Sequence, residues 1–72
     1  MTIKPRMTVR VNGEAISLLE DSTLADLIMA MGLENKRIAI ECDGVIIPRS
    51  QYATIAITPE NQLEIVHAIG GG

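Results

Sequence analysis

The sequence contains few of the residue types that enzymes use for chemistry. It has one histidine, His67, one cysteine, Cys42, and acidic residues at irregular spacings, as on a solvated surface. Nucleophilic catalysis needs a nucleophile, an adjacent base and a third group that orients the base. One histidine and one cysteine do not make up such a set. We therefore expect that the chain is not an enzyme and has no catalytic residue of its own.

Both residues have an ordinary structural explanation. His67 lies in or just after an expected last strand, where we expect a half-buried position that happens to be polar. Cys42 lies in the middle of an alternating apolar run, where a thiol behaves as a small hydrophobic side chain and is usually unreactive. A single cysteine excludes an internal disulfide and a multi-cysteine metal site, and it favours a reducing, cytoplasmic location.

A glycine run, Gly70 to Gly72, closes the sequence and is the remaining candidate for chemistry. It is not a phosphate-binding loop, because no helix follows it, so we expect no bound cofactor or metal. Glycine loses more freedom on ordering than any other residue, and the run should therefore be flexible. Residues 68–72 could span about 17 Å when extended. The alternative is that these glycines are a frayed terminus or a cloning remnant.

Such a tail could be threaded into the active site of another protein. Without a Cβ, Gly70, Gly71 and Gly72 would pass through a narrow channel and leave the last carbonyl open to attack. The reactive group would be the Gly72 carboxylate, which is ionised at neutral pH and is a poor acyl donor. A partner would have to activate it, most simply by ATP-dependent adenylation.

Composition limits the fold and the partners. The 72 residues suffice for one domain, and 47% of them are hydrophobic, with Tyr52 as the one aromatic residue, so the core must be aliphatic. The net charge of −3 without a cationic cluster argues against binding to nucleic acid. No apolar run approaches the roughly 20 residues that span a membrane, and we expect no membrane association. We predict a single domain over 1–72, in which 1–6 could be a disordered extension and 68–72 a flexible tail.

Two alternating runs, MTVRV and EAISLL, flank the dipeptide Asn12-Gly13. Asn-Gly is well suited to a two-residue type I′ turn, so this segment predicts a β-hairpin that begins at Met7. The turn also sets the register on the apolar face, which pairs Val11 with Glu14, Val9 with Ile16 and Met7 with Leu18.

The next segment, STLADLIMAMGL, has the spacing of a helix. One apolar stripe is predicted, consisting of Leu24, Leu27, Ile28 and Met31. Thr23 is a natural N-cap and Asp26, three residues later, can complete a capping box. Gly32 stands where a left-handed residue would end the helix, and Leu33 could then fold back onto Ile28.

The second half repeats the hairpin and adds one strand. Asp43-Gly44 should turn between KRIAIEC and VII, pairing Cys42 with Val45 and Ile40 with Ile47, and Pro48 should end the strand. The segment from 48 to 62 predicts a helical turn near 50–52, core contacts by Ile55 and Ile57, and a turn at 59–61. LEIV predicts a last strand with Leu63 and Ile65 on one face. This order predicts an α+β domain of the β-grasp architecture, a mixed sheet of four to five strands covered on one face by one main helix.

The capped helix, the segment IAIECDGVIIPRSQY and the ending LEIVHAIGGG together resemble the ThiS family, bacterial ubiquitin-like sulfur carrier proteins of thiamine biosynthesis. The resemblance covers about Met7 to Gly72. Its most specific parts are the tripeptide Ile47-Pro48-Arg49 and the ending with Val66, His67, Gly70, Gly71 and Gly72.

This resemblance implies a recycled co-substrate whose partners do the catalysis. An E1-like adenylyltransferase would use ATP and Mg²⁺ to adenylate the Gly72 carboxylate, and a persulfide sulfur donor would convert it to a thiocarboxylate. Thiazole synthase would then accept the sulfur. Beside the tail, Val66, Ala68 and Ile69 could give a partner an apolar contact, and His67 and Arg49 are further candidates for the interface; all could equally be ordinary surface residues.

Two rival functions remain open from the sequence. One is the small subunit of molybdopterin synthase, which shares a terminal Gly-Gly but typically has more aromatic residues and a proline before it. The other is a ubiquitin-like binding module that docks through its sheet and never uses its terminus.

Overall fold

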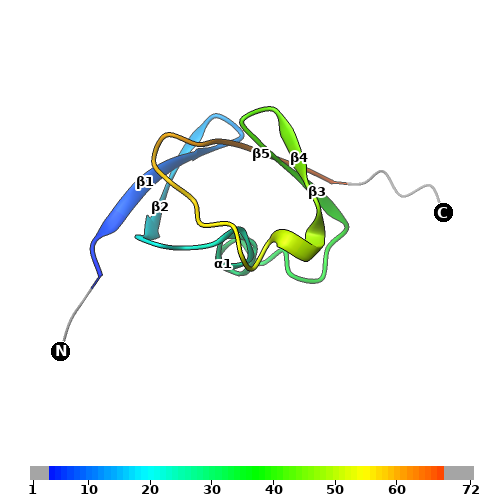
Figure 1. Ribbon diagram of the computed structural model, residues 1–72, viewed down its shortest axis with the longest axis horizontal. Helices are drawn as coiled ribbons and strands as arrows, with labels where there is room; N and C mark the ends of the chain where they lie inside the picture. The colour runs from blue at the N-terminus through cyan, green and yellow to red at the C-terminus, as the bar shows by residue number, and fades with distance from the viewer. Residues whose placement is uncertain (1–3, 68–72) are drawn as a thin grey trace.

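The computed structural model describes residues 4–67, in which five strands form one sheet that a single helix crosses on one face (Figure 1). The elements follow the chain as β1 (Arg6–Val11), β2 (Glu14–Leu19), α1 (Leu24–Ala30), β3 (Ile38–Cys42), β4 (Val45–Ile47), the 3₁₀ turn η1 (Arg49–Gln51) and β5 (Gln62–His67). The strand order is β2-β1-β5-β3-β4, in which β1 and β5 are parallel and the other neighbours antiparallel. The predicted α+β fold with a mixed sheet is confirmed.

Both hairpins have the predicted register. β1 and β2 pair Val11 with Glu14, Val9 with Ile16 and Met7 with Leu18, and β3 and β4 pair Cys42 with Val45 and Ile40 with Ile47. The two turn dipeptides have positive φ at both residues, as a type I′ turn requires: Asn12 (53°), Gly13 (81°), Asp43 (53°) and Gly44 (85°). Turn chemistry and alternation of apolar residues therefore specify the same pairing.

The helix α1 has hydrogen-bond partners for all of its first N–H groups. Thr23 Oγ1 accepts from the Asp26 N–H at 3.2 Å, and the Asp26 carboxylate accepts from the Thr23 N–H at 2.9 Å, which completes the predicted capping box. The N–H groups of Leu24 and Ala25 donate to carbonyls of the segment that crosses back over the sheet, those of Ile55 (3.1 Å) and Tyr52 (2.9 Å). Two carbonyls of the crossing segment thus accept the hydrogen bonds that water would otherwise accept from the first N–H groups of the helix.

The helix ends as the sequence predicts, in a Schellman motif at Gly32. Gly32 has a φ of 71°, its N–H donates to Met29 O at 3.1 Å, and the Leu33 N–H donates to Ile28 O at 2.9 Å. One detail differs from the prediction. Met31 is the C-cap residue and is 37% exposed, so the buried stripe of the helix ends at Ile28.

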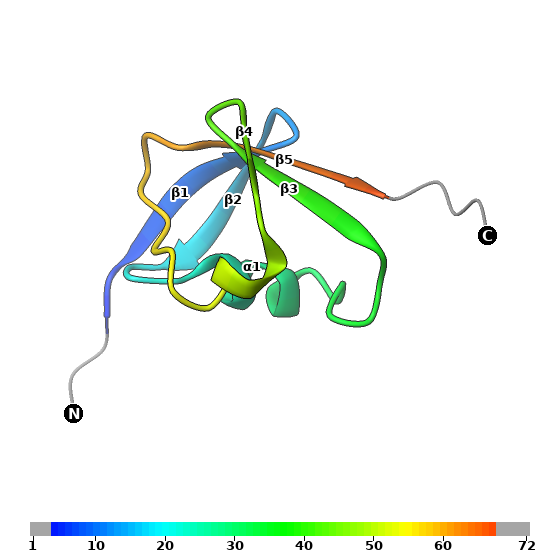
Figure 2. The same ribbon diagram turned by 45° about the vertical axis from the view of Figure 1, so that its right-hand side comes forward.

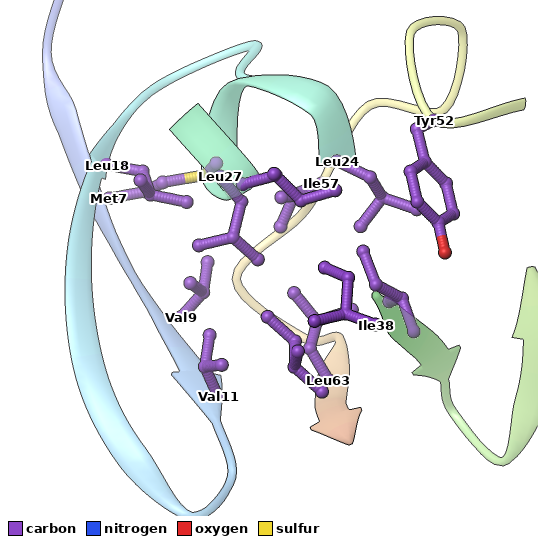
Figure 3. Close-up of a cluster of buried hydrophobic side chains, with 13 residues drawn as sticks. Met7, Val9, Val11, Leu18, Leu24, Leu27, Ile38, Tyr52, Ile57 and Leu63 are labelled. Carbon is purple, nitrogen blue, oxygen red and sulfur yellow. The ribbon is translucent and has the colours of Figure 1, made fainter. Parts of the chain in front are cut away.

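The core lies between α1 and the sheet (Figure 3). It is aliphatic apart from Tyr52, as composition predicts, and consists of Met7, Val9, Val11, Leu18, Leu24, Leu27, Ile28, Ile38, Ile40, Tyr52, Ile57, Leu63 and Ile65. Of the two residues expected as core contacts in the crossing segment, Ile57 is buried and Ile55 packs against the core from its edge. Every strand except β4 contributes a buried side chain, and α1 together with the crossing segment covers this face of the sheet.

The folded region begins earlier than the predicted boundary at Met7. Arg6 is the first residue of β1, and its Nε donates to Ser17 Oγ at 2.8 Å. The carbonyl of Pro5 accepts from the Glu20 N–H at 2.9 Å. The alternation of apolar residues could not locate this start, because Arg6 faces solvent and a proline precedes it.

Asp43 joins the second hairpin to the start of β5. Its Oδ1 accepts from the Gln62 N–H at 2.8 Å, and its Oδ2 accepts from Asn61 Nδ2 at 2.9 Å. The hydrogen bond from the Gln62 backbone, followed by that from Asn61, holds the pKa of the Asp43 carboxyl below its ordinary value of 3.8. The ionised form is therefore the one that favours folding.

This pKa shift predicts how the contact depends on pH. Because the pKa is lowered in the folded state, the stabilisation is present above the ordinary pKa of 3.8 and is lost as the pH falls through the folded pKa. The measurement is the melting temperature of the protein and of Asp43→Asn, which keeps the turn but does not titrate. Wild type should melt higher above pH 3.8, and the difference should shrink below that pH. A difference that does not change with pH would contradict the role given to the Asp43 charge.

Candidate functional site

The predicted reactive tail lies outside the described residues. This applies to the modification site Gly72, to the threading residues Gly70 and Gly71, and to the candidate interface residues Ala68 and Ile69. The structure does describe the element that leads to them. Strand β5 runs through the centre of the sheet between β1 and β3, and its last residue, His67, lies at one end of the sheet (Figure 2).

Strands β3 and β1, the two neighbours of β5, pair with different numbers of its residues. β3 pairs with it through five residues, from Leu63 to His67. β1 pairs with it at two positions only, Arg10 with Gln62 and Val11 with Leu63. The end of β5 is therefore supported by β3, while on its other side the strand pairing has already stopped.

Val66 points outward from the face opposite the helix, as predicted, and is 50% exposed. Ala39 lies directly opposite it on β3. Ile46, on the outer face of β4, is 64% exposed and pairs with Glu41, two residues along β3 from Ala39. Val66, Ala39 and Ile46 therefore form a diagonal apolar row across three neighbouring strands, which we call the outer apolar row.

The burial of His67 differs from what the sequence predicts. This residue alternates onto the same face as Leu63 and Ile65, toward the helix side, but it is exposed and not half-buried. The reason is its place in the register: it pairs with Ile38, the first residue of β3, so it lies at the very end of the sheet.

Arg49 lies apart from the outer apolar row. It is the first residue of η1, and its Nη2 donates to the Lys36 carbonyl at 3.4 Å. It also lines a hollow of about 290 Å³ between α1, η1 and the start of β3, together with Ile28 and Ile38. Arg49 therefore lies on the helix side of the sheet, whereas Val66 points outward from the opposite face.

The Cys42 thiol lies beside the negative charge of Asp43. Its side chain is partly buried and packs against the core. Burial, together with the negative charge of Asp43 and a 3.8 Å contact from Sγ to Asp43 Oδ2, raises the pKa of the Cys42 thiol above its ordinary value. The thiol is therefore protonated at neutral pH, whereas nucleophilic chemistry needs the thiolate.

Residues 4–67 offer no other obvious chemical centre. Within this region no three histidine, cysteine or acidic side chains come together in a way that could hold a metal ion. No helix among these residues is long and apolar enough to cross a membrane. What the described structure supplies is a sheet whose central strand, β5, precedes the glycine run in the sequence.

One contact of this region has no signal in the local sequence. Asn12 was predicted as a turn residue only, yet its side chain bonds to the backbone of Ile65 on β5. The two residues are 53 positions apart, and nothing in the local pattern around Asn12 indicates which strand its amide meets.

A search of solved structures finds the same fold. The crystal structure of a thiamine biosynthesis protein, ThiS from Geobacter metallireducens, superposes with a TM-score of 0.78, covering 92% of this chain and 100% of that one at 20% identity. Taken with the strand order and the single covering helix, this similarity defines the domain as a ubiquitin-like β-grasp domain.

The sequence comparisons identify the family. The pattern of the ThiS family matches residues 9–72. The sulfur carrier protein ThiS of Bacillus subtilis is 32% identical over 65 residues, which are 89% of this chain and 98% of that protein. The chain belongs to the ThiS family.

Two larger proteins contain a region similar to this chain. They are the thiazole synthases of Magnetococcus marinus, 32% identical over 66 residues, and of Paramagnetospirillum magneticum, 35% identical over 66 residues. In both cases the match covers 92% of this chain, and the chain spans 20% of the length of the synthase.

Proposed function

We propose that this chain is a sulfur carrier of thiamine biosynthesis and that its reactive group is the carboxylate of Gly72. The observation that carries the proposal is the extent of the family match, which runs to residue 72 and so includes the glycine run. The similarity to the Bacillus subtilis carrier, over 98% of that protein's length, also supports the proposal.

The first step is activation. An oxygen of the Gly72 carboxylate attacks the α-phosphate of ATP on an E1-like adenylyltransferase, pyrophosphate leaves, and the product is an acyl adenylate. The ATP and Mg²⁺ belong to the partner. The carrier contributes only the carboxylate, which has to be converted into an acyl donor because the free anion is unreactive toward nucleophiles.

The second step transfers sulfur. The outer sulfur of a persulfide attacks the acyl carbon and AMP leaves, which produces an acyl disulfide. A thiol then reduces the S–S bond. One sulfur atom remains on the acyl carbon, so Gly72 now ends in a thiocarboxylate. The persulfide donor supplies the sulfur atom and the thiol supplies two electrons.

Thiazole synthase is proposed as the acceptor of the sulfur. The two synthases that contain a region similar to this chain support this choice, because they place a carrier-like region and a synthase in one polypeptide. The outer apolar row beside the end of β5 would give a partner an apolar contact next to the tail. Its members Val66 and Ile46 are among the large apolar side chains that the described structure leaves exposed.

The test is the intact mass of the protein after incubation with an E1-like adenylyltransferase, ATP, Mg²⁺, a persulfide donor and a thiol. We expect one oxygen atom to be replaced by one sulfur atom, and tandem fragmentation should place the change on Gly72. The matched control omits ATP and should leave the mass unchanged. An unchanged mass with ATP present would contradict the proposal and would favour a binding module that never uses its terminus.

A further inference from the structure

Strand β5 extends beyond the strand that should support it on one side. β1 pairs with β5 at Gln62 and Leu63 and then ends at Val11, because the chain turns at Asn12-Gly13. β5 continues to His67. In a parallel pair, every second residue of β5 directs its N–H and C=O toward β1, here Leu63 and then Ile65. The backbone of β5 at Ile65 therefore faces the place where β1 has already turned away.

The side chain of Asn12 occupies this place. Its Oδ1 accepts from the Ile65 N–H at 2.8 Å, and its Nδ2 donates to the Ile65 carbonyl at 3.2 Å. The backbone N–H of Asn12 also donates to the Leu63 carbonyl at 2.8 Å. A carboxamide carries the same acceptor and donor as a peptide unit, so Asn12 lengthens the β1–β5 pairing by one step after β1 has ended.

Asparagine meets two requirements at this position. The type I′ turn needs a residue that tolerates a φ of 53°, which restricts the choice mainly to Asn, Asp and Gly. The contact with Ile65 needs both a donor and an acceptor. Gly offers neither and ionised Asp offers acceptors only, so Asn is the one residue of the three that satisfies the turn and the strand together.

The turn residue of the other hairpin also forms a hydrogen bond with the backbone of β5. Asp43 is the corresponding residue of the β3–β4 turn, also at a φ of 53°, and its carboxylate accepts from the Gln62 N–H. β1 and β3 flank β5 on opposite sides, so the two turn residues hold this strand from both sides. Asp43 does so at the first residue of β5 and Asn12 at the fourth, close to where the chain leaves the sheet.

We propose that Asn12 is a positioning residue for the carrier reaction: its amide holds β5 at Ile65 and thereby fixes the direction in which the chain leaves the sheet after His67. This inference rests on the proposed function, because direction matters only if a partner binds the domain and the Gly72 carboxylate at once. A loosened strand end spreads the carboxylate over more positions, and a smaller fraction of the molecules is then competent to bind productively. The chemistry of the bound state is unchanged, since Asn12 does not touch the reacting group.

The test uses Asn12→Gly and Asn12→Asp, both of which keep a residue suited to the turn. Gly removes both side-chain bonds, and Asp replaces the donor to the Ile65 carbonyl with a negatively charged oxygen. Steady-state adenylation with the E1-like adenylyltransferase should show a KM for the carrier raised by about fivefold or more, because a smaller fraction of the molecules presents the carboxylate productively. The kcat should stay within about twofold of the wild-type value. Amide hydrogen exchange should be faster at Ile65 and His67 in Asn12→Gly.

Thr23→Ala is the matched control, because it removes the cap of α1 and destabilises the fold at a site away from the outgoing end of β5. Its melting temperature should fall by an amount comparable to that of the Asn12 variants, with the KM unchanged. If the Asn12 variants show no greater rise in KM than Thr23→Ala does, Asn12 is merely structural and the inference is wrong. Failure of the wild-type protein to be adenylated would instead contradict the proposed function, and the two failures are therefore distinguishable.

Discussion

Deletion of Gly72 is expected to abolish adenylation and sulfur transfer while leaving the fold intact. The reason is that the proposed reactive carboxylate is moved back by one residue, about 3.5 Å, and no longer reaches the position from which it attacks the α-phosphate of ATP on the partner. The buried core lies within residues 7–65, so the deletion removes no core side chain from the described structure. Circular dichroism reports on the fold, and an assay of pyrophosphate release with the E1-like adenylyltransferase reports on activation.

A chain extended by one alanine after Gly72 provides the matched control for this experiment. It keeps all three glycines but moves the carboxylate outward and adds a Cβ beside it. We expect this chain also to be inactive and to have the circular dichroism spectrum of the wild type. Full activity of either variant would show that the carboxylate of Gly72 is not the reactive group, and unfolding of the shortened chain would show that the tail is structural.

Leu27→Ala should have the opposite effect, lowering stability without a direct effect on the reactive group. Leu27 is 0% exposed and packs from the centre of α1 onto the sheet (Figure 3). Truncation of a buried leucine costs roughly 2–5 kcal/mol, since it removes apolar contacts and leaves a cavity. A domain with a total stability of about 5–15 kcal/mol loses a large share of it. The measurement is the free energy of unfolding from urea titration.

Met29→Ala is a suitable control on the same helix, because Met29 is 65% exposed. The substitution keeps a good helix former in place and should change the free energy of unfolding by no more than about 0.5 kcal/mol. If Leu27→Ala and Met29→Ala cost similar amounts, the buried stripe of α1 does not carry the stability assigned to it.

The parts of the fold that were predicted from the sequence are those with local causes. In each hairpin, alternating apolar residues and a dipeptide suited to a type I′ turn specify the same register, and the structure has that register. The helix is bounded by Thr23 and Gly32, whose side-chain chemistry and backbone freedom act within a few residues. Such signals can be read without knowledge of the rest of the chain.

The features that the sequence did not predict depend on the position of distant elements. The contact between Asn12 and Ile65 exists because β1 ends where β5 continues, and this length difference appears only once the strand order is known. The exposure of His67 has a similar cause. His67 lies on the face that the helix covers, but it pairs with the first residue of β3, at the end of the sheet. Alternation assigns a face to a residue, but whether that face is covered depends on how far its neighbours extend.

The position of β5 also affects how this domain can fold during synthesis. β5 is made after the other four strands, yet it occupies the middle of the sheet between β1 and β3. Until it emerges from the ribosome, the two hairpins have no common strand and can form only as separate halves. Pairing of β1 with β5 joins segments from opposite ends of the described chain, and closing so long a loop is slow compared with forming a local hairpin. A nascent chain should therefore lack the complete sheet, and stay sensitive to proteases, until its last strand has emerged from the ribosome.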